Sequence, residues 1–100
     1  MFDPSFMSKL GAMQQMAEET KRQLDLETVE GEAGNGLVVI SLTGNRTLKS
    51  LKINTELEQM SKEDLEDLLT IALNRALDAA NKLNEAQTLK AAQSFLPGMM

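Results

Sequence analysis

Residues 31–45 constrain the fold of this chain more than any other segment, because they place one strand-like run between two clusters of turn-forming residues (GEAGNGLVVISLTGN). Glycine adopts positive φ without steric cost, and asparagine tolerates the left-handed region better than most residues. The residues of these two types are Gly34, Asn35, Gly36, Gly44 and Asn45. The two clusters therefore predict two tight hairpin turns.

The run between the turns has the alternation of a half-buried strand. Val38, Ile40 and Leu42 share one face at period two, and the opposite face carries Leu37, Val39, Ser41 and Thr43. With a neighbour on each side, the segment predicts three antiparallel strands at about 26–33, 36–43 and 46–54, in the sheet order first, second, third.

The flanking strands differ in polarity. In the third strand, alternation places Leu51 and Ile53 on one face with Lys49, and Leu48, Ser50 and Lys52 on the other. The first strand is polar around Val29, with Glu27, Glu30 and Glu32, which favours a place at the edge of the sheet.

A first helix is expected over residues 5–25, beginning at Asp3-Pro4. Its apolar positions follow a spacing of four and three residues: Phe6, Leu10, Met13, Ala17, Thr20 and Leu24. This seam fits either a helix that packs on its own domain or a coiled coil. Packing on its own domain is favoured, because alanine and threonine weaken a coiled-coil seam.

A second, longer helix is expected over residues 61–94, with Ser61 as its N-cap. Its apolar face includes Ala72 and Ala76, whose small side chains would permit close approach of another element, whereas Asn81 is expected on the outer face. Pro97 and Gly98 end the helix and leave a short tail at residues 95–100.

These elements predict a single α+β domain, residues 1–100, built from a helix, a three-stranded antiparallel meander and a long helix. The second helix spans roughly 50 Å at 1.5 Å per residue, whereas a compact domain of this length has a radius of gyration of about 13 Å. The helix must therefore project. With both helices on one side of the sheet, Leu37 and Val39 would lack cover, which predicts a homodimer.

Composition removes most catalytic chemistry. The chain has no cysteine and no histidine, so thiolate nucleophiles, disulfides and the commonest metal ligand are absent. No catalytic, cofactor-binding or metal site, and no small-molecule substrate, is expected. Nothing approaches the roughly 20 apolar residues of a membrane helix and no signal peptide begins the chain, which favours a cytoplasmic protein without membrane contact.

The order of elements and several motifs resemble a known family. The motifs are GEAGNGLV at 31–38, Gly44-Asn45, Leu51-Lys52-Ile53, LEDLL at 65–69, ALNRA at 72–76 and LPGM at 96–99. Together they resemble the YbaB/EbfC family of bacterial nucleoid-associated proteins across nearly the whole chain. The resemblance implies a tweezers-like homodimer whose helices protrude and bind double-stranded DNA, with effects on nucleoid organisation and gene expression.

The charge distribution permits this function despite a net charge of −5. Residues 55–70 carry six carboxylates and one lysine, at the start of the second helix where negative charge stabilises the helix dipole. The candidate contacts to DNA phosphates are Lys21, Arg22, Arg75, Lys82 and Lys90. Aromatic residues are too few for base stacking, so binding through the DNA backbone with low sequence specificity is expected.

A protein-binding module is the alternative. Projecting helices with methionine and leucine side chains could hold protein clients as an adaptor or chaperone, in the manner of prefoldin subunits. Two features argue against prefoldin itself: the first helix is too short to pair with the second as a tentacle, and the hub has three strands.

Overall fold

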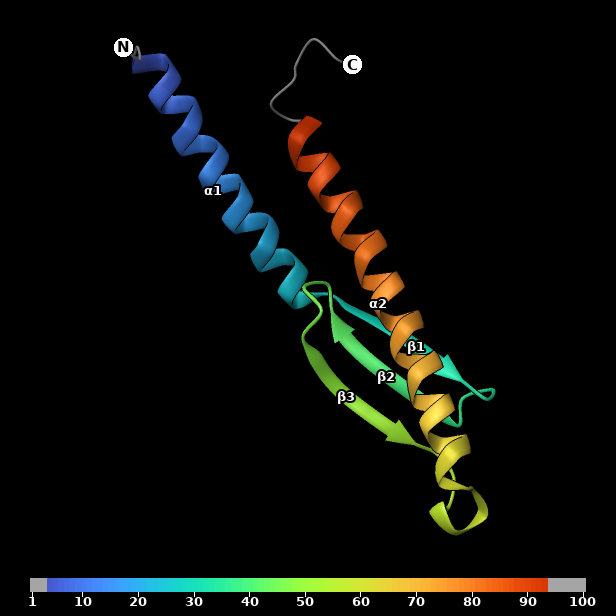
Figure 1. Ribbon diagram of the computed structural model, residues 1–100. Helices are drawn as coiled ribbons and strands as arrows, with labels where there is room; N and C mark the ends of the chain where they lie inside the picture. The colour runs from blue at the N-terminus through green and yellow to red at the C-terminus, as the bar shows by residue number, and fades with distance from the viewer. Residues whose placement is uncertain (1–3, 94–100) are drawn as a thin grey trace.

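The structure is a computed structural model that describes residues 4–93 (Figure 1). Its element order is α1 (Pro4–Leu26), β1 (Thr28–Ala33), β2 (Val38–Thr43), β3 (Leu48–Ile53), the 3₁₀-helix η1 (Leu57–Gln59) and α2 (Lys62–Gln93). The predicted helix, meander and long helix are confirmed. The expected contribution of Asp3 to the first helix and the tail at residues 95–100 lie outside the described residues.

The three strands form one antiparallel sheet in the order β1-β2-β3, as the short connections predicted. The first turn uses its glycine-rich sequence as expected, because Gly34, Asn35 and Gly36 all have positive φ, at 66°, 55° and 87°. β1 is an edge strand, which agrees with its polar sequence.

The strict alternation expected for β3 is wrong at its first residue. A β-bulge interrupts the register between Ser41 and Leu42, so that Leu42 pairs with Leu48 while Ile40 pairs with Leu51. An extra residue in one strand shifts every following side chain to the other face. Leu48 therefore shares a face with Leu51 and Ile53, and not with Ser50 and Lys52.

The second turn also departs from expectation. Neither Gly44 nor Asn45 has positive φ; the residue with positive φ is Arg46, at 69°. Gly44 serves close packing instead, because a Cβ there would lie 2.8 Å from Leu24 Cδ2 and 2.9 Å from the Leu24 carbonyl oxygen. The Gly44 amide also donates to that carbonyl at 2.9 Å, which ties the turn to the end of α1.

The core lies between the sheet and the first half of α2. Ala72, Ala76 and Ala80 are completely buried and pack with residues of β1 and β2, namely Ala33, Val38, Ile40 and Leu42. The small alanines permit close approach, as predicted. α2 crosses β1 so closely that a Cβ on Gly31 would lie 2.2 Å from both the Ala72 carbonyl oxygen and the Ala76 amide nitrogen.

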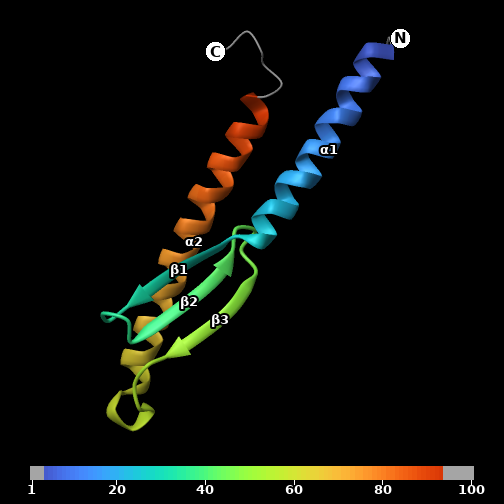
Figure 2. The same cartoon turned by 180° about the vertical axis from the view of Figure 1, so that it is seen from behind.

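The expectation that both helices cover the sheet is wrong. Only α2 packs on it, whereas α1 leaves the sheet at Leu26 and runs beside the second half of α2 (Figures 1 and 2). Leu24 at the end of α1 is buried, but Leu10 and Met13 are 43% and 51% exposed. The prediction that the first helix packs on its own domain holds for its second half, where Met16 and Thr20 are half-buried and α1 contacts α2.

The resulting molecule is long and narrow, with principal extents of 67 × 23 × 21 Å and a radius of gyration of 19.4 Å. The radius exceeds the roughly 13 Å of a compact domain of this length, so the projection inferred from helix length is confirmed. α1 begins, and α2 ends, at the same extremity of the molecule (Figure 1).

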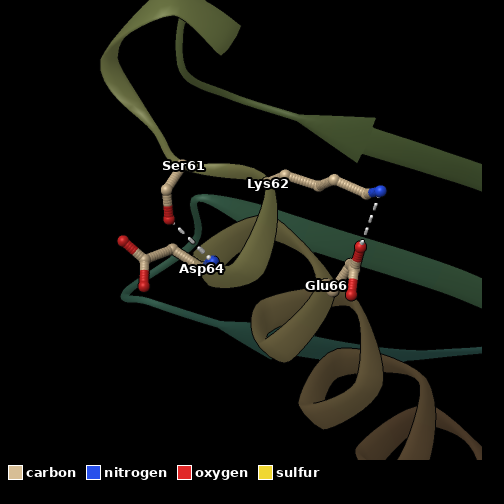
Figure 3. Close-up of polar contacts among 4 residues, drawn as sticks. All are labelled: Ser61, Lys62, Asp64 and Glu66. Carbon is tan, nitrogen blue, oxygen red and sulfur yellow. Dashed lines mark hydrogen bonds and ion pairs between the residues drawn. The ribbon is translucent and has the colours of Figure 1, made fainter.

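The opposite extremity is formed by η1 and the start of α2. Ser61 caps α2 as predicted: its Oγ accepts a hydrogen bond from the Asp64 amide at 3.0 Å (Figure 3). One turn away, Lys62 and Glu66 form an exposed ion pair at 3.9 Å. The preceding 3₁₀-helix was not expected from the sequence.

Candidate nucleic-acid interface

α1 and residues 81–93 of α2 form a two-helix projection, here called the stem. The two helices leave a groove on each side of their contact. The first groove, of about 450 Å³, is lined mainly by Met13, Met16, Ala17, Leu24 and Ala91, with polar groups at its edges. The second groove, of about 430 Å³, is more polar and includes Glu19, Gln23, Gln87 and Lys90.

Two of the five predicted DNA contacts lie at these grooves, on opposite sides of the stem. Lys21 of α1 lines the first groove, next to Asn45. Lys90 of α2 lines the second groove with Glu19. Both lysines are exposed, so each can reach a phosphate, but one flat surface cannot contact both.

Arg75 lies outside the stem. Its Nη1 donates to the Glu32 carbonyl oxygen at 2.8 Å, at the free edge of β1. Arg75 thus satisfies a backbone acceptor that no neighbouring strand pairs, which is a structural role for this residue. The residue is nevertheless exposed, and a guanidinium has donors left for a phosphate.

The remaining two predicted contacts, Arg22 and Lys82, are exposed and line neither groove. Lys82 lies seven residues after Arg75, so the two share one stripe of α2, as expected from the helical period. Lys90 lies eight residues after Lys82, so its side chain lies off this stripe, on the side of α2 that faces α1. Four of the five cations are therefore distributed around the stem, Arg75 lies beside β1, and the five form no single patch.

The acidic run lies at the other end of the molecule. The six carboxylates of residues 55–70 are all exposed: Glu56, Glu58, Glu63, Asp64, Glu66 and Asp67. They surround η1 and the first turns of α2, below the sheet in Figure 1, whereas the stem projects above it. The long axis of the molecule thus separates the strongest negative charge from the stem.

A further arginine lies at the root of the stem. Arg46, in the turn between β2 and β3, donates from Nε to Asn81 Oδ1 at 2.5 Å. The expectation that Asn81 is on a free outer face is therefore wrong: it is half-buried and bonded across 35 residues of sequence. From the sequence, Arg46 belongs with Lys49 and Lys52 to a second cationic cluster on the last hairpin. It is absent from the predicted contacts because burial of this hairpin in a dimer gave a structural role equal weight.

The other two cations of the β2–β3 hairpin, Lys49 and Lys52, lie on the face of the sheet that α2 leaves open. Lys49 Nζ donates to Thr28 Oγ1 at 2.8 Å across the face that α2 leaves open. Lys52 pairs with Val39 in the register of β2 and β3 and lies on that same face.

Residues 4–93 offer no group of three or more carboxylates arranged to hold a metal ion. Neither α1 nor α2, the long helices of the described chain, has an apolar window sufficient to cross a membrane.

Comparison with known proteins assigns the chain to a family. The model of the YbaB/EbfC DNA-binding family matches residues 3–95. A nucleoid-associated protein of Flavobacterium johnsoniae is 36% identical over 93 residues, which cover 93% of this chain and 87% of that protein. A nucleoid-associated protein of Psychrobacter sp. is 35% identical over 101 residues, with coverages of 95% and 92%.

A solved structure shows the same fold. The crystal structure of an uncharacterized protein from Helicobacter pylori superposes with a TM-score of 0.79 at 22% identity, and covers 90% of this chain and 97% of that one. The family model and the two relatives, with the shared arrangement of helix, meander and long helix, agree with the resemblance found in the motifs. This chain is a member of the YbaB/EbfC DNA-binding family.

Proposed function

We propose that this protein is a homodimeric, nucleoid-associated protein that binds double-stranded DNA with low sequence specificity and thereby affects nucleoid organisation and gene expression. The observation that carries the proposal is the stem, which presents exposed lysine and arginine side chains at a distance from the acidic base of α2. The family and the names of the relatives support nucleoid association and DNA binding.

The arrangement of the cations supports contacts to phosphates in place of base readout. Four exposed cations of the stem do not share a common face: Lys21, Arg22, Lys82 and Lys90. Specific recognition needs several side chains held together toward base edges in one groove. Scattered cations contribute counterion release, which is independent of sequence.

A salt titration tests DNA binding. Fluorescence anisotropy of two labelled duplexes of unrelated sequence, measured from about 50 to 200 mM salt, should give similar affinities and a linear fall of log affinity with log salt. An affinity for one duplex that greatly exceeds the other would contradict low specificity. No binding even at about 50 mM salt would contradict the DNA-binding function.

The proposed dimer is supported by apolar surface that one chain leaves uncovered. Leu48 and Leu51 are 57% and 45% exposed although they share the face of the sheet on which α2 packs, because α2 covers β1 and β2 alone. Leu73 of α2 is also 40% exposed. Exposed leucines on neighbouring elements are typical of a subunit interface.

Light scattering coupled to gel filtration tests the dimer. The wild type should show twice the chain mass of 11.0 kDa at micromolar concentration. A Leu48→Glu, Leu51→Glu variant should shift toward the monomer mass, whereas Leu89→Glu, which changes an equally exposed leucine on the stem, should remain dimeric. A monomeric wild type at all concentrations would exclude the tweezers arrangement.

A protein-binding adaptor is the second candidate, and one observation favours it. Met7, Leu10 and Met13 of α1 are between 43% and 58% exposed and form a stripe along the stem. Wild-type protein that does not bind duplex DNA at low salt would favour the adaptor function.

A further inference from the structure

The turn between β2 and β3 is attached to the root of the stem, where α1 ends and α2 leaves the sheet (Figure 1). Asn45 Nδ2 donates to the Lys21 carbonyl oxygen at 2.8 Å and to Asp25 Oδ1 at 2.6 Å. The Gly44 amide donates to the Leu24 carbonyl oxygen at 2.9 Å. The turn is therefore held against the last turns of α1, close to the first groove.

Arg46 connects this turn to the other stem helix. Its Nε donates to Asn81 Oδ1 at 2.5 Å, and Asn81 directly precedes Lys82. The exposed guanidinium thus lies between the end of α1, which carries Lys21, and the part of α2 that carries Lys82. Among residues 4–93, its two terminal amino groups have no further hydrogen bond or ion pair.

The backbone of Arg46 adopts a conformation that an arginine rarely takes. Its φ is 69°, in the left-handed region, although the glycine and the asparagine immediately before it are the residue types that usually adopt this region. The three-residue hairpin loop requires this conformation at its last position, and non-glycine residues that adopt it destabilise the fold and are concentrated at functional sites. Glycine at position 46 would serve the turn better than arginine does.

We propose that Arg46 is a phosphate-binding residue at the root of the stem, oriented by Asn81, which extends the cations of the two helices onto the sheet. The inference rests on the proposed DNA-binding function. With Nε engaged by Asn81, the terminal amino groups are the donors that remain for the oxygens of a phosphate. Asp25 of α1, the carboxylate that is hydrogen-bonded to this turn, accepts from Asn45 and leaves the guanidinium of Arg46 unpaired with a carboxylate within the described part of the chain.

The test is Arg46→Gly, which removes the cation and suits the left-handed backbone. Loss of one phosphate contact should lower the slope of log affinity against log salt by roughly 0.9 and weaken duplex binding about eightfold at about 0.1 M salt. The midpoint of thermal unfolding should not fall, because glycine relieves the backbone. Arg46→Asn, a second residue type that tolerates positive φ, should behave alike.

Two controls separate a local contact from a general loss of positive charge or of the turn. Lys62→Ala removes an exposed cation among the carboxylates at the far end of α2 and should leave the slope unchanged. Asn81→Ala should weaken binding less than Arg46→Gly, because the charge remains but is no longer oriented. Combined with Arg46→Gly, it should add no further loss.

The outcomes distinguish this inference from the function on which it rests. Wild-type protein that binds the duplex, with Arg46→Gly and Arg46→Asn showing the wild-type slope, would overturn the role of Arg46 and leave DNA binding intact. Wild-type protein that binds no duplex would overturn both. A lowered slope in Lys62→Ala equal to that of Arg46→Gly would show a charge effect without a local contact and would also overturn the role.

Discussion

At the scale of single residues, two glycines decide how closely the backbones approach one another. Gly31 lies where α2 crosses β1, and Gly44 lies where the second turn meets the end of α1. In both places, the atoms that a Cβ would meet include backbone atoms, which cannot rotate away as the end of a side chain can. The packing of α2 on β1, and of the end of α1 on the second turn, therefore depends on the absence of two methyl groups.

We expect Gly31→Ala to destabilise the fold strongly. The new Cβ would lie 2.2 Å from the Ala72 carbonyl oxygen and the Ala76 amide nitrogen, so α2 must move off β1. The cost should be at least about 1–3 kcal/mol in the free energy of unfolding, measured by chemical denaturation.

Gly11→Ala is the matched control for this change. Gly11 lies within α1, and a Cβ there has no neighbour within 4 Å. Alanine should therefore raise stability, by up to about 1 kcal/mol, through helix propensity alone. A loss at Gly11 similar to that at Gly31 would contradict the close-approach explanation.

At the scale of elements, α2 performs two tasks along its length. Its first half is held by burial of Ala72, Ala76 and Ala80 on the sheet, and its N-terminus is held by the Ser61 cap. Its second half has only α1 beside it, with open grooves on both sides. Helices draw most of their stability from tertiary packing, so the two halves should differ in stability.

The Ser61 cap can be tested alone. Ser61→Ala removes the acceptor of the Asp64 amide and should lower the free energy of unfolding by about 1 kcal/mol. Ser61→Asp keeps an acceptor at the same position and adds a favourable charge at the helix N-terminus, so it should retain wild-type stability. Equal losses in both variants would show that the hydroxyl itself packs against something other than this amide.

Hydrogen exchange should show the difference between the two halves of α2. Amides near Ala76 and Ala80 should be protected to nearly the global stability, because these residues are completely buried. Amides of residues 85–92 should exchange faster through local opening, measured by mass spectrometry of peptic fragments. Equal protection would mean that a second chain covers the stem.

At the scale of the whole molecule, charge is organised along the 67 Å axis. The net charge of −5 conceals this order. Six carboxylates and one lysine gather at the end that holds η1, whereas the stem carries five cations (Lys9, Lys21, Arg22, Lys82 and Lys90) and four carboxylates (Glu18, Glu19, Asp25 and Glu85). Over such distances, salt screens one end from the other, since the Debye length is about 8 Å at physiological ionic strength. The electrostatic energy of a phosphate at the stem would therefore depend mainly on the charged side chains of the stem.

The double change Lys82→Glu, Lys90→Glu should weaken binding to every duplex alike. If each lysine contacts a phosphate, the slope of log affinity against log salt should fall by roughly 0.9 for each. Both side chains are exposed, so stability and oligomeric state should not change.

A matched double variant controls for net charge. Lys52→Glu, Lys62→Glu makes the same change in charge on the sheet and at the acidic base, away from the stem. It should retain most of the slope. An equal loss in the two double variants would refute the stem as the DNA-binding surface.

Local pattern was sufficient for the elements and their order. Glycine and asparagine clusters specify turns, period-two alternation specifies strands, and Ser61 specifies a helix start, because each depends on neighbours in sequence. The antiparallel order β1-β2-β3 also followed, since short connections leave no other pairing. The motifs that resemble the YbaB/EbfC family were likewise recognisable in the sequence itself.

Tertiary structure alone decided how these elements share space. The β-bulge that returns Leu48 to the face of Leu51, the requirement for glycine at positions 31 and 44, and the departure of α1 from the sheet all depend on contacts between residues distant in sequence. The same holds for Arg46, whose partner Asn81 is 35 residues away. Sequence period records which residues share a face of one element, but the approach of two backbones is set by the packing of the whole chain.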